Sequence, residues 1–154
     1  MSAAMKRARS AVYATDLSPA ARPAFARALQ LAKQDRARLV LLHVLMPPSP
    51  FLGDELPASF VDLQVRARRE VERQLADLVA QAKKAGVPVE PRIVEGEPSE
   101  EILRAARRHR ADMIVMGTHG RTGLGRVFMG STAERVLQRA TCPVCTVRAP
   151  SARS

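Results

Sequence analysis

Apolar residues form two kinds of pattern that alternate from one end of the chain to the other. Five short runs are continuously apolar and rich in Val, Ile and Leu, as strands buried in a parallel sheet are. They lie at residues 10–15, 37–45, 87–94, 112–117 and 143–147. Between them, apolar positions recur every three or four residues, the spacing of one face of an α-helix. The pattern therefore predicts five strands separated by four helices.

The helical segments carry start and stop signals. They begin near residues 19, 59, 98 and 131. Ser18 is the predicted N-cap of the first segment, with Pro19 at the first helical position, where a missing N–H leaves no bond unmade. The second segment is the longest and is predicted to stop at Gly86, because glycine suits the left-handed conformation that ends many helices.

Strands that alternate with helices of this length predict an α/β fold, an open parallel sheet with helices on both faces and right-handed crossovers. A chain of 154 residues fits one domain. We expect an ordered core over about residues 9–149 with short terminal tails. The proline-rich segment 46–57 follows the second strand and is expected to be a surface excursion, not a domain boundary.

The net charge of +10 changes the range of partners to consider. Several arginines stand one helical turn from an acid, as Arg66 does from Glu70 and Arg68 from Glu72, which favours solvated helix faces. Only Tyr13 and four Phe could stack on bases, and the sequence carries no known nucleic-acid-binding motif. Nucleic acid is therefore not the expected partner, and a polyanion-binding surface stays open as the alternative.

No apolar run approaches the roughly 18 residues that suggest a membrane span. The basic cluster near the N-terminus is followed by an apolar stretch that ends at Asp16, which is too short for the core of a secretory signal. We therefore expect a cytoplasmic protein with no membrane partner.

Cys142 and Cys145 have the spacing of redox and zinc motifs. They fall in a β-type run, in which residues three apart point to opposite faces, so the two thiols are expected to diverge. A zinc site would also need further ligands, and the sequence has no second Cys pair and no His pair. The cysteines are interpreted as small packed side chains, and no metal site is assigned to the protein.

Five of the eight glycines lie between Gly117 and Gly130, directly after the fourth predicted strand and before the fourth helix. Ligands of open parallel sheets bind at the carboxyl ends of strands whose connections diverge. Glycines let backbone N–H groups approach an anion, and the start of the next helix adds unpaired N–H groups. Ser131 and Thr132 offer hydroxyl donors. This pattern predicts a phosphate site; a loop whose glycines only permit turns is the alternative.

Two common phosphate motifs do not fit. A Walker loop needs Gly-Lys-Ser/Thr, and no lysine follows Lys84. The dinucleotide fingerprint should follow the first strand, where the chain reads TDLSP without a glycine. The sequence instead resembles the universal stress protein family over nearly its whole length, from VYATDLS through LLHV to MGTHGRTGLGRVFMGSTAERVL and CPVCTV. The family's nucleotide signature, Gly, two residues, Gly, nine residues, Gly and Ser or Thr, is met by Gly117, Gly120, Gly130 and Ser131.

This resemblance implies a Rossmann-like domain with strand order 3-2-1-4-5 and a bound adenine nucleotide, commonly ATP, with Mg or Mn left open as a companion cation. Thr15 and Asp16 would lie at the base and ribose end, Val44 against the adenine, and the glycine loop at the phosphates. A homodimer through the fifth strand is also implied. The full set of implied nucleotide-binding residues is Thr15, Asp16, Val44, Met116, Gly117, His119, Gly120, Arg121, Gly130, Ser131 and Thr132.

The implied role is that of a nucleotide-dependent regulator or sensor in the stress response, with an unidentified protein partner left open. His119 titrates near neutrality, but catalysis would also need a positioned water and a cation clamp. Asp16 is the only acid expected in the crevice, so no catalytic residue is assigned and any ATP hydrolysis is expected to be slow. A slow hydrolysing or nucleotidyl-transferring enzyme and a nucleotide-free interaction module are the alternatives. His43 is expected to be a hydrogen-bonded core residue.

Overall fold

The computed structural model describes residues 8–47, 56–118 and 129–150. The predicted alternation of strands and helices is confirmed, and each strand begins and ends within two residues of its predicted bounds. The strands are β1 (Ser10–Ala14), β2 (Arg38–Leu45), β3 (Val89–Glu95), β4 (Met113–Gly117) and β5 (Val144–Val147). The helices are α1 (Arg22–Asp35), α2 (Ala58–Lys84), α3 (Pro98–Arg108) and α4 (Ser131–Arg139), with a 3-10 turn η1 (Pro19–Ala21) before α1.

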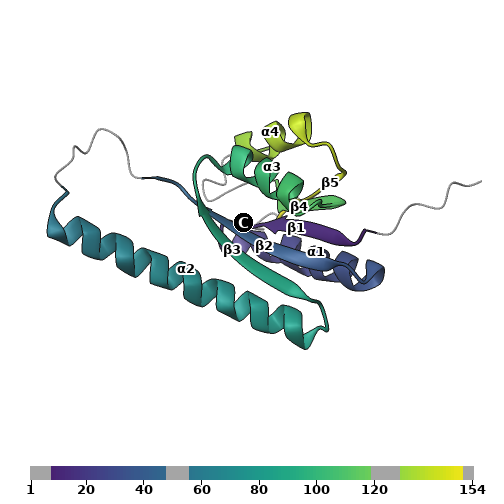
Figure 1. Ribbon diagram of the computed structural model, residues 1–154, viewed down its shortest axis with the longest axis horizontal. Helices are drawn as coiled ribbons and strands as arrows, with labels where there is room; N and C mark the ends of the chain where they lie inside the picture. Colours follow the sequence, from purple (N-terminus) through teal and green to yellow (C-terminus); the bar gives the residue numbers. More distant parts are fainter. Residues whose placement is uncertain (1–7, 48–55, 119–128, 151–154) are drawn as a thin grey trace, which may run out of the picture.

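The five strands form one parallel sheet in the order β3-β2-β1-β4-β5 (Figure 1). In the centre, Val12 of β1 lies opposite Val40 of β2 and Ile114 of β4. The chain builds outward on one side from β1 to β3 and then crosses to place β4 on the other side of β1. The α/β fold with order 3-2-1-4-5 is therefore confirmed, and the switch in direction lies between β1 and β4.

Helices cover both faces of the sheet, α1 and α2 on one face and α3 and α4 on the other (Figure 1). Successive strand residues point to opposite faces, so each strand contributes to two cores. Leu41 and Val115 lie in the core under α1 and α2, whereas Leu42 and Ile114 lie in the core under α3 and α4. All four side chains are almost completely buried, which explains why the strand sequences are continuously apolar.

The first helix begins later than predicted, and Ser18 does not cap it. Ser18 precedes the 3-10 turn, and its side chain makes no capping bond. Its hydroxyl instead donates to Oδ1 of Asp16 at 2.6 Å, and its backbone N–H donates to the same oxygen at 2.9 Å. Because Ser18 bonds to Asp16, its hydroxyl is not available to cap the helix, and α1 starts at Arg22.

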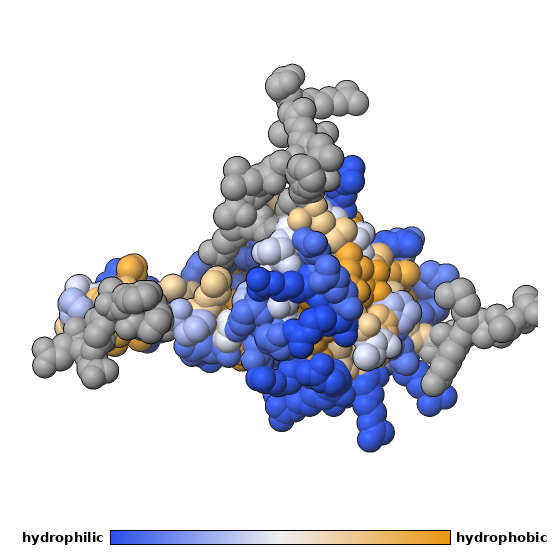
Figure 2. Space-filling view, turned by 90° about the horizontal axis from the view of Figure 1, so that it is seen from above, coloured by the Kyte–Doolittle hydropathy of each residue, from blue (hydrophilic) through white to orange (hydrophobic). Residues whose placement is uncertain are grey.

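The long helix α2 packs on the sheet with its second half only. Val71, Leu75 and Ala82 are buried, whereas Val61 and Leu63 in the first half are 48% and 63% exposed. Figure 2 shows hydrophobic residues at this projecting end of the molecule. At about 1.5 Å per residue, the 27 residues of α2 span about 40 Å, which is longer than the sheet that supports them.

Ion pairs cover the exposed side of α2. Arg68 pairs with Glu72 at 3.3 Å as predicted. Arg66, in contrast, pairs with Asp62 at 3.2 Å, because Glu70 is held by Arg73 at 2.6 Å. Within the described part of the chain, no helix is both long enough and apolar enough to cross a membrane.

We expect Leu41→Ala to lower the free energy of unfolding by about 2–5 kcal/mol, because it leaves a cavity between β2 and the helices α1 and α2. Leu63→Ala is the matched control on the exposed part of α2 and should change it by less than about 0.5 kcal/mol. Urea unfolding followed by circular dichroism measures both. Equal effects of the two substitutions would contradict the assigned core.

Candidate functional site

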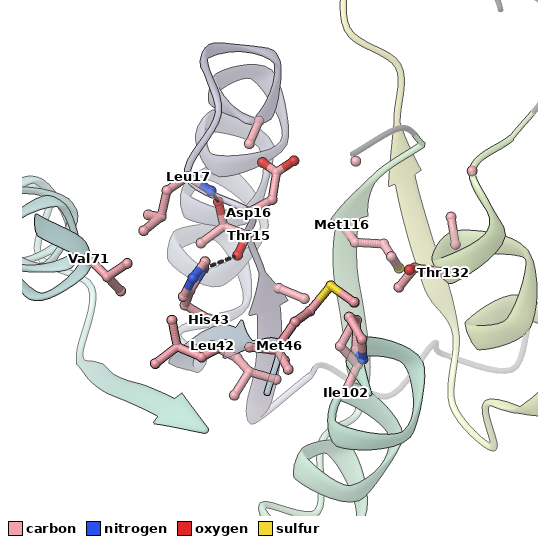
Figure 3. Close-up of a pocket in the computed structure, with 18 of the residues that line it drawn as sticks. Thr15, Asp16, Leu17, Leu42, His43, Met46, Val71, Ile102, Met116 and Thr132 are labelled. Carbon is pink, nitrogen blue, oxygen red and sulfur yellow. Dashed lines mark hydrogen bonds between the residues drawn. The ribbon is translucent and has the colours of Figure 1, made fainter. Parts of the chain in front are cut away.

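A cavity of about 720 Å³ opens at the carboxyl ends of β1, β2 and β4. Helices α2, α3 and α4 and the turn η1 complete its walls. Figure 3 shows the end of β1, with Thr15 and Asp16, between Val71 of α2 on one side and Met116 and Thr132 on the other. The cavity lies at the switch point between β1 and β4, where the sequence predicted a ligand. Its volume falls within the roughly 300–1,000 Å³ typical of small-molecule sites.

The segment after β1 is held in a tight, specific conformation. The backbone N–H of Thr15 donates to the carbonyl of Leu42 at 3.0 Å, which continues the sheet for one residue. Leu17 adopts a left-handed conformation with φ of 64°, and its N–H donates to the Thr15 hydroxyl at 3.0 Å. Asp16 accepts both bonds from Ser18 with Oδ1. These bonds fix the Asp16 carboxylate at the cavity wall.

The turn η1 is attached to the core through Tyr13. The Tyr13 hydroxyl donates to the carbonyl of Ala21 at 3.0 Å, and Ala21 lines the cavity. The Tyr13 ring is 1% exposed and packs against Phe25 of α1 with the ring centroids 5.5 Å apart. Burial raises the pKa of Tyr13 to about 12.

His43 is a hydrogen-bonded core residue, as the sequence predicted, and it also lines the cavity. Its side chain is 6% exposed, and Nδ1 lies 2.9 Å from the carbonyl oxygen of Thr15 (Figure 3). Because a carbonyl oxygen only accepts, Nδ1 carries the proton in this contact. His43 therefore links the end of β2 to the segment that holds Asp16.

Apolar side chains form the wall on the α3 and α4 face. Leu42, Ile102 and Met116 are buried in one cluster, and Val44 packs against it. Both Val44 and Met116, which the resemblance assigned to the site, line the cavity. A flat apolar ring system fits this wall, since nothing there requires a polar partner.

The start of α4 forms the opposite end of the cavity. Gly130 is its N-cap, with φ of −62°, and its N–H donates to the carbonyl of Thr118 at 2.6 Å. In the described part of the chain, no side chain caps α4, and Gly130, Ser131 and Thr132 all line the cavity. An uncapped helix start presents N–H donors and the positive end of the helix dipole, which suits an anion.

Of the predicted site residues, Thr15, Asp16, Val44, Met116, Gly117, Gly130, Ser131 and Thr132 line this one cavity. The other three, His119, Gly120 and Arg121, lie outside the described residues. Segments more than a hundred residues apart in the sequence thus meet at one place because parallel strands end at the same edge of the sheet.

Helix α2 contributes cavity residues that the sequence interpretation missed, among them Ala67, Glu70 and Gln74. The expectation that Asp16 is the only acid in the crevice is therefore wrong. Glu70 accepts bonds from Arg73 at 2.6 and 3.0 Å and from Gln74 at 2.9 Å. These bonds, those from Arg73 first, lower the pKa of Glu70 to about 2. Glu70 is thus ionised at neutral pH, with its charge paired to Arg73, and it is a poor proton donor. The apolar spacing of α2 carried no signal that Glu70 lines the cavity.

The two cysteines diverge as predicted. Cys142 packs against the core under α3 and α4, and Cys145 packs against the core under α1 and α2. Both are free, and burial raises the pKa of the Cys142 thiol. Within residues 8–47, 56–118 and 129–150, no group of three or more His, Cys, Asp or Glu side chains could hold a metal ion.

A sequence model of the universal stress protein family matches residues 8–148. The chain belongs to this family. Universal stress protein MJ0531 of Methanocaldococcus jannaschii is 36% identical over 139 residues, which cover 90% of this chain and 81% of that protein. A universal stress protein of Thermus aquaticus is 36% identical over 141 residues, 91% of this chain and 98% of that protein.

Solved structures share the fold of this universal stress protein. The structure of MJ0577 superposes with a TM-score of 0.81 at 26% identity and covers 94% of this chain and 98% of its own. A universal stress protein in complex with cAMP superposes with a TM-score of 0.70 at 24% identity, over 92% of this chain and 98% of its own. The Archaeoglobus fulgidus protein in complex with dAMP superposes with a TM-score of 0.64 at 23% identity, over 90% of this chain and 96% of its own. At these last two identities the likeness is one of fold.

We expect the unfolding free energy of this protein to fall as the pH rises from about 10 toward 12. Tyr13 in the unfolded chain ionises near pH 10, whereas the folded chain keeps it neutral up to about 12. Below about pH 10 both states bind the proton and the stabilisation is complete; above that pH the unfolded state loses the proton first.

Because Tyr13 is the only tyrosine, phenolate absorbance reports its ionisation directly. Urea unfolding at a series of alkaline pH values measures the stability, and Tyr13→Phe should lack this contribution to the pH dependence. A phenolate midpoint near pH 10 in the folded protein would contradict the prediction.

Proposed function

We propose that this universal stress protein binds an adenine nucleotide, in the first place ATP, in the cavity at the carboxyl edge of the sheet. The observation that carries the proposal is the meeting of three chemically different walls in one cavity. An apolar wall, a carboxylate and an uncapped helix start match a base, a sugar and a phosphate chain respectively. A nucleotide-dependent regulator in the stress response is the role that this binding would serve.

The cavity residues suggest an orientation for the nucleotide. The adenine ring fits against Val44 and Met116, where it would bury apolar surface. The Asp16 carboxylate is an acceptor for ribose hydroxyls. Ser131 and Thr132 open α4 and would donate to the phosphates together with its first backbone N–H groups.

Two solved proteins with this fold carry adenine nucleotides, cAMP in one and dAMP in the other. They share the fold of this chain, so the proposal depends on the residues that this chain itself places in the cavity. Those residues match the family's nucleotide signature at Gly117, Gly130 and Ser131, and the three lie at one cavity.

The cavity favours binding over rapid turnover. Fast phosphoryl transfer needs cations that neutralise the phosphates and a group that orients the attacking water. Among the described residues, the carboxylates at the cavity are Asp16 and Glu70. Asp16 accepts two bonds from Ser18, and Glu70 is already in an ion pair with Arg73. Mg or Mn would therefore arrive with the phosphates, and hydrolysis would be slow.

We expect Gly130→Asp to weaken ATP binding by about a hundredfold or more. A carboxylate beside the phosphates adds a repulsion of a few kcal/mol, and about 1.4 kcal/mol corresponds to each tenfold loss. Asp is a favourable N-cap residue, so the variant should remain folded. Isothermal titration calorimetry measures the affinity.

Gly130→Asn is the matched control, because Asn has the same shape and caps helices equally well but carries no charge. It should retain far more of the affinity than the Asp variant. Unchanged ATP affinity in folded Gly130→Asp would refute the phosphate position.

We further propose a homodimer formed through β5, which lies at one edge of the sheet. The carbonyl of Pro143 accepts a bond from Ile114 of β4 at 3.0 Å, and that of Val147 accepts one from Thr118, directly after β4, at 3.1 Å. Backbone groups alternate in direction along a strand, so those of Val144 and Thr146 point away from β4. An apolar edge strand with outward-facing N–H and C=O groups can pair with a second copy.

Thr146→Pro should convert the dimer to a monomer of 16.8 kDa, because proline removes an outward N–H and leaves the bonds to β4 in place. Thr146→Val retains the N–H and is the control, which should remain dimeric. Light scattering after size exclusion measures the mass. A wild-type protein that is monomeric at micromolar concentration would overturn the dimer.

A further inference from the structure

Basic side chains gather at the end of the sheet opposite the cavity. All five parallel strands begin at this end, and the helices terminate there (Figure 1). The part formed by the ends of α1, α2 and α3 and the starts of β1 to β4 is called here the amino pole. Arginines and lysines that are scattered in the sequence are brought together there because parallel strands all start at one edge. In the described part of the chain, nine exposed basic residues belong to the amino pole: Arg9, Lys33, Arg36, Arg38, Lys83, Lys84, Arg107, Arg108 and Arg110.

Negative charge at the amino pole is too small to balance these residues. Of the described residues, three carboxylates lie there, Asp35, Glu90 and Asp112. Glu90 pairs with Arg38 at 4.0 Å and also with Arg92, while Asp35 and Asp112 accept backbone N–H groups. The three helix ends add about half a negative charge each. The pole remains positive by several charges after both contributions.

Two of the basic residues occupy positions at which helices ordinarily place glycine. All three helices end with the same pair of backbone bonds, in which the residue that closes the turn is left-handed. After α2 this residue is Gly86, with φ of 78°, but after α1 and α3 it is Arg36, with φ of 55°, and Arg110, with φ of 49°. A left-handed arginine is less favourable than glycine. The chain therefore keeps two cations at this pole against the local backbone preference.

The surroundings of these cations indicate the chemistry of the partner. Protein partners are usually anchored by apolar or aromatic residues, and none of the large exposed apolar residues of the described chain belongs to the ends of α1, α2 and α3 or to the starts of β1 to β4. Met46, Val61, Leu63, Val65 and Met129 lie away from this edge of the sheet, and Leu137 lies in the last turn of α4, outside the part defined as the pole. Among the described residues, the pole has no Phe, Tyr or Trp side chain on which a single-stranded base could stack. A surface of Arg and Lys alone matches a dense, regular row of phosphates.

We propose that the amino pole binds the phosphate backbone of duplex nucleic acid without reading its sequence. The pole and the nucleotide cavity lie at opposite ends of the sheet, so each can be occupied while the other is filled. The proposed duplex binding does not require ATP. A test that refutes it therefore leaves the proposed nucleotide site unaffected, and the reverse is also true.

The double variant Arg36→Gly, Arg110→Gly tests this proposal with the full chain. Binding to a fluorescent DNA duplex of about 20 base pairs is measured by anisotropy over a range of salt concentrations. The variant should bind at least about tenfold more weakly at low salt, and the slope of log K against log salt should shrink by about 2, one for each arginine. Its melting temperature should not fall, because glycine relieves the left-handed positions.

Two further variants serve as controls. Arg66→Gln, Arg68→Gln removes the same charge from the exposed side of α2, outside the pole, and should leave duplex affinity within about twofold of wild type. Gly86→Arg adds a cation at the third equivalent helix end and should raise duplex affinity. Equal weakening by the α2 and pole variants would overturn the proposal, because it would show an effect of net charge alone.

Other anionic partners are separated by parallel titrations with a polyglutamate peptide of matched charge and with vesicles containing anionic phospholipid. Tighter binding to either of these than to the duplex would overturn the proposal in favour of an acidic protein or a membrane surface. A wild-type protein that does not bind the duplex at low salt would overturn it as well. A variant with a lowered melting temperature and unchanged duplex affinity would assign the two arginines a structural role only.

Discussion

The double pairing of β1 fixes the positions of almost all other features. β1 is hydrogen-bonded to β2 on one side and to β4 on the other, all three in parallel. Parallel neighbours require crossovers, and the crossovers from β1 and β4 leave toward opposite faces. The gap between those connections is the cavity. The same parallel arrangement collects the helix ends and their basic residues at the opposite edge, so one pairing pattern creates both an anion site and a cationic surface.

Much of the fold was readable in the sequence because burial on both faces makes the strands continuously apolar. Val40 and Leu41 show this directly, since adjacent residues enter different cores. The start of α1 was not readable in the same way. Ser18 and Pro19 form a strong local helix signal, but the preceding Asp16 competes for the Ser18 hydroxyl, and only the folded turn shows which bond is made.

The cavity was predictable to the extent that it is built from strand ends and from the start of α4. Val44, Met116 and Gly130 follow from the position of each segment in a parallel sheet. The place of Glu70 at the cavity could not be predicted in this way, because it depends on how far α2 extends beyond the sheet and on the rotation of that helix about its axis. The amino pole was missed for a related reason: local charge spacing describes pairs on one helix, whereas the pole gathers residues from three helices and several strands.

The overhang of α2 has a consequence for motion. Its first turns have little tertiary packing, since residues 61–70 are all exposed. An isolated helix of fewer than about 12–15 residues is only marginally stable in water. These turns can therefore unwind without opening the core, whereas the turns from Val71 onward are held by the sheet. Ala67 and Glu70 stand at the border between the two parts and line the cavity. Unwinding of these turns would therefore reshape one wall of the cavity, and a ligand that contacts this wall would oppose the unwinding by stabilising the helical form of α2.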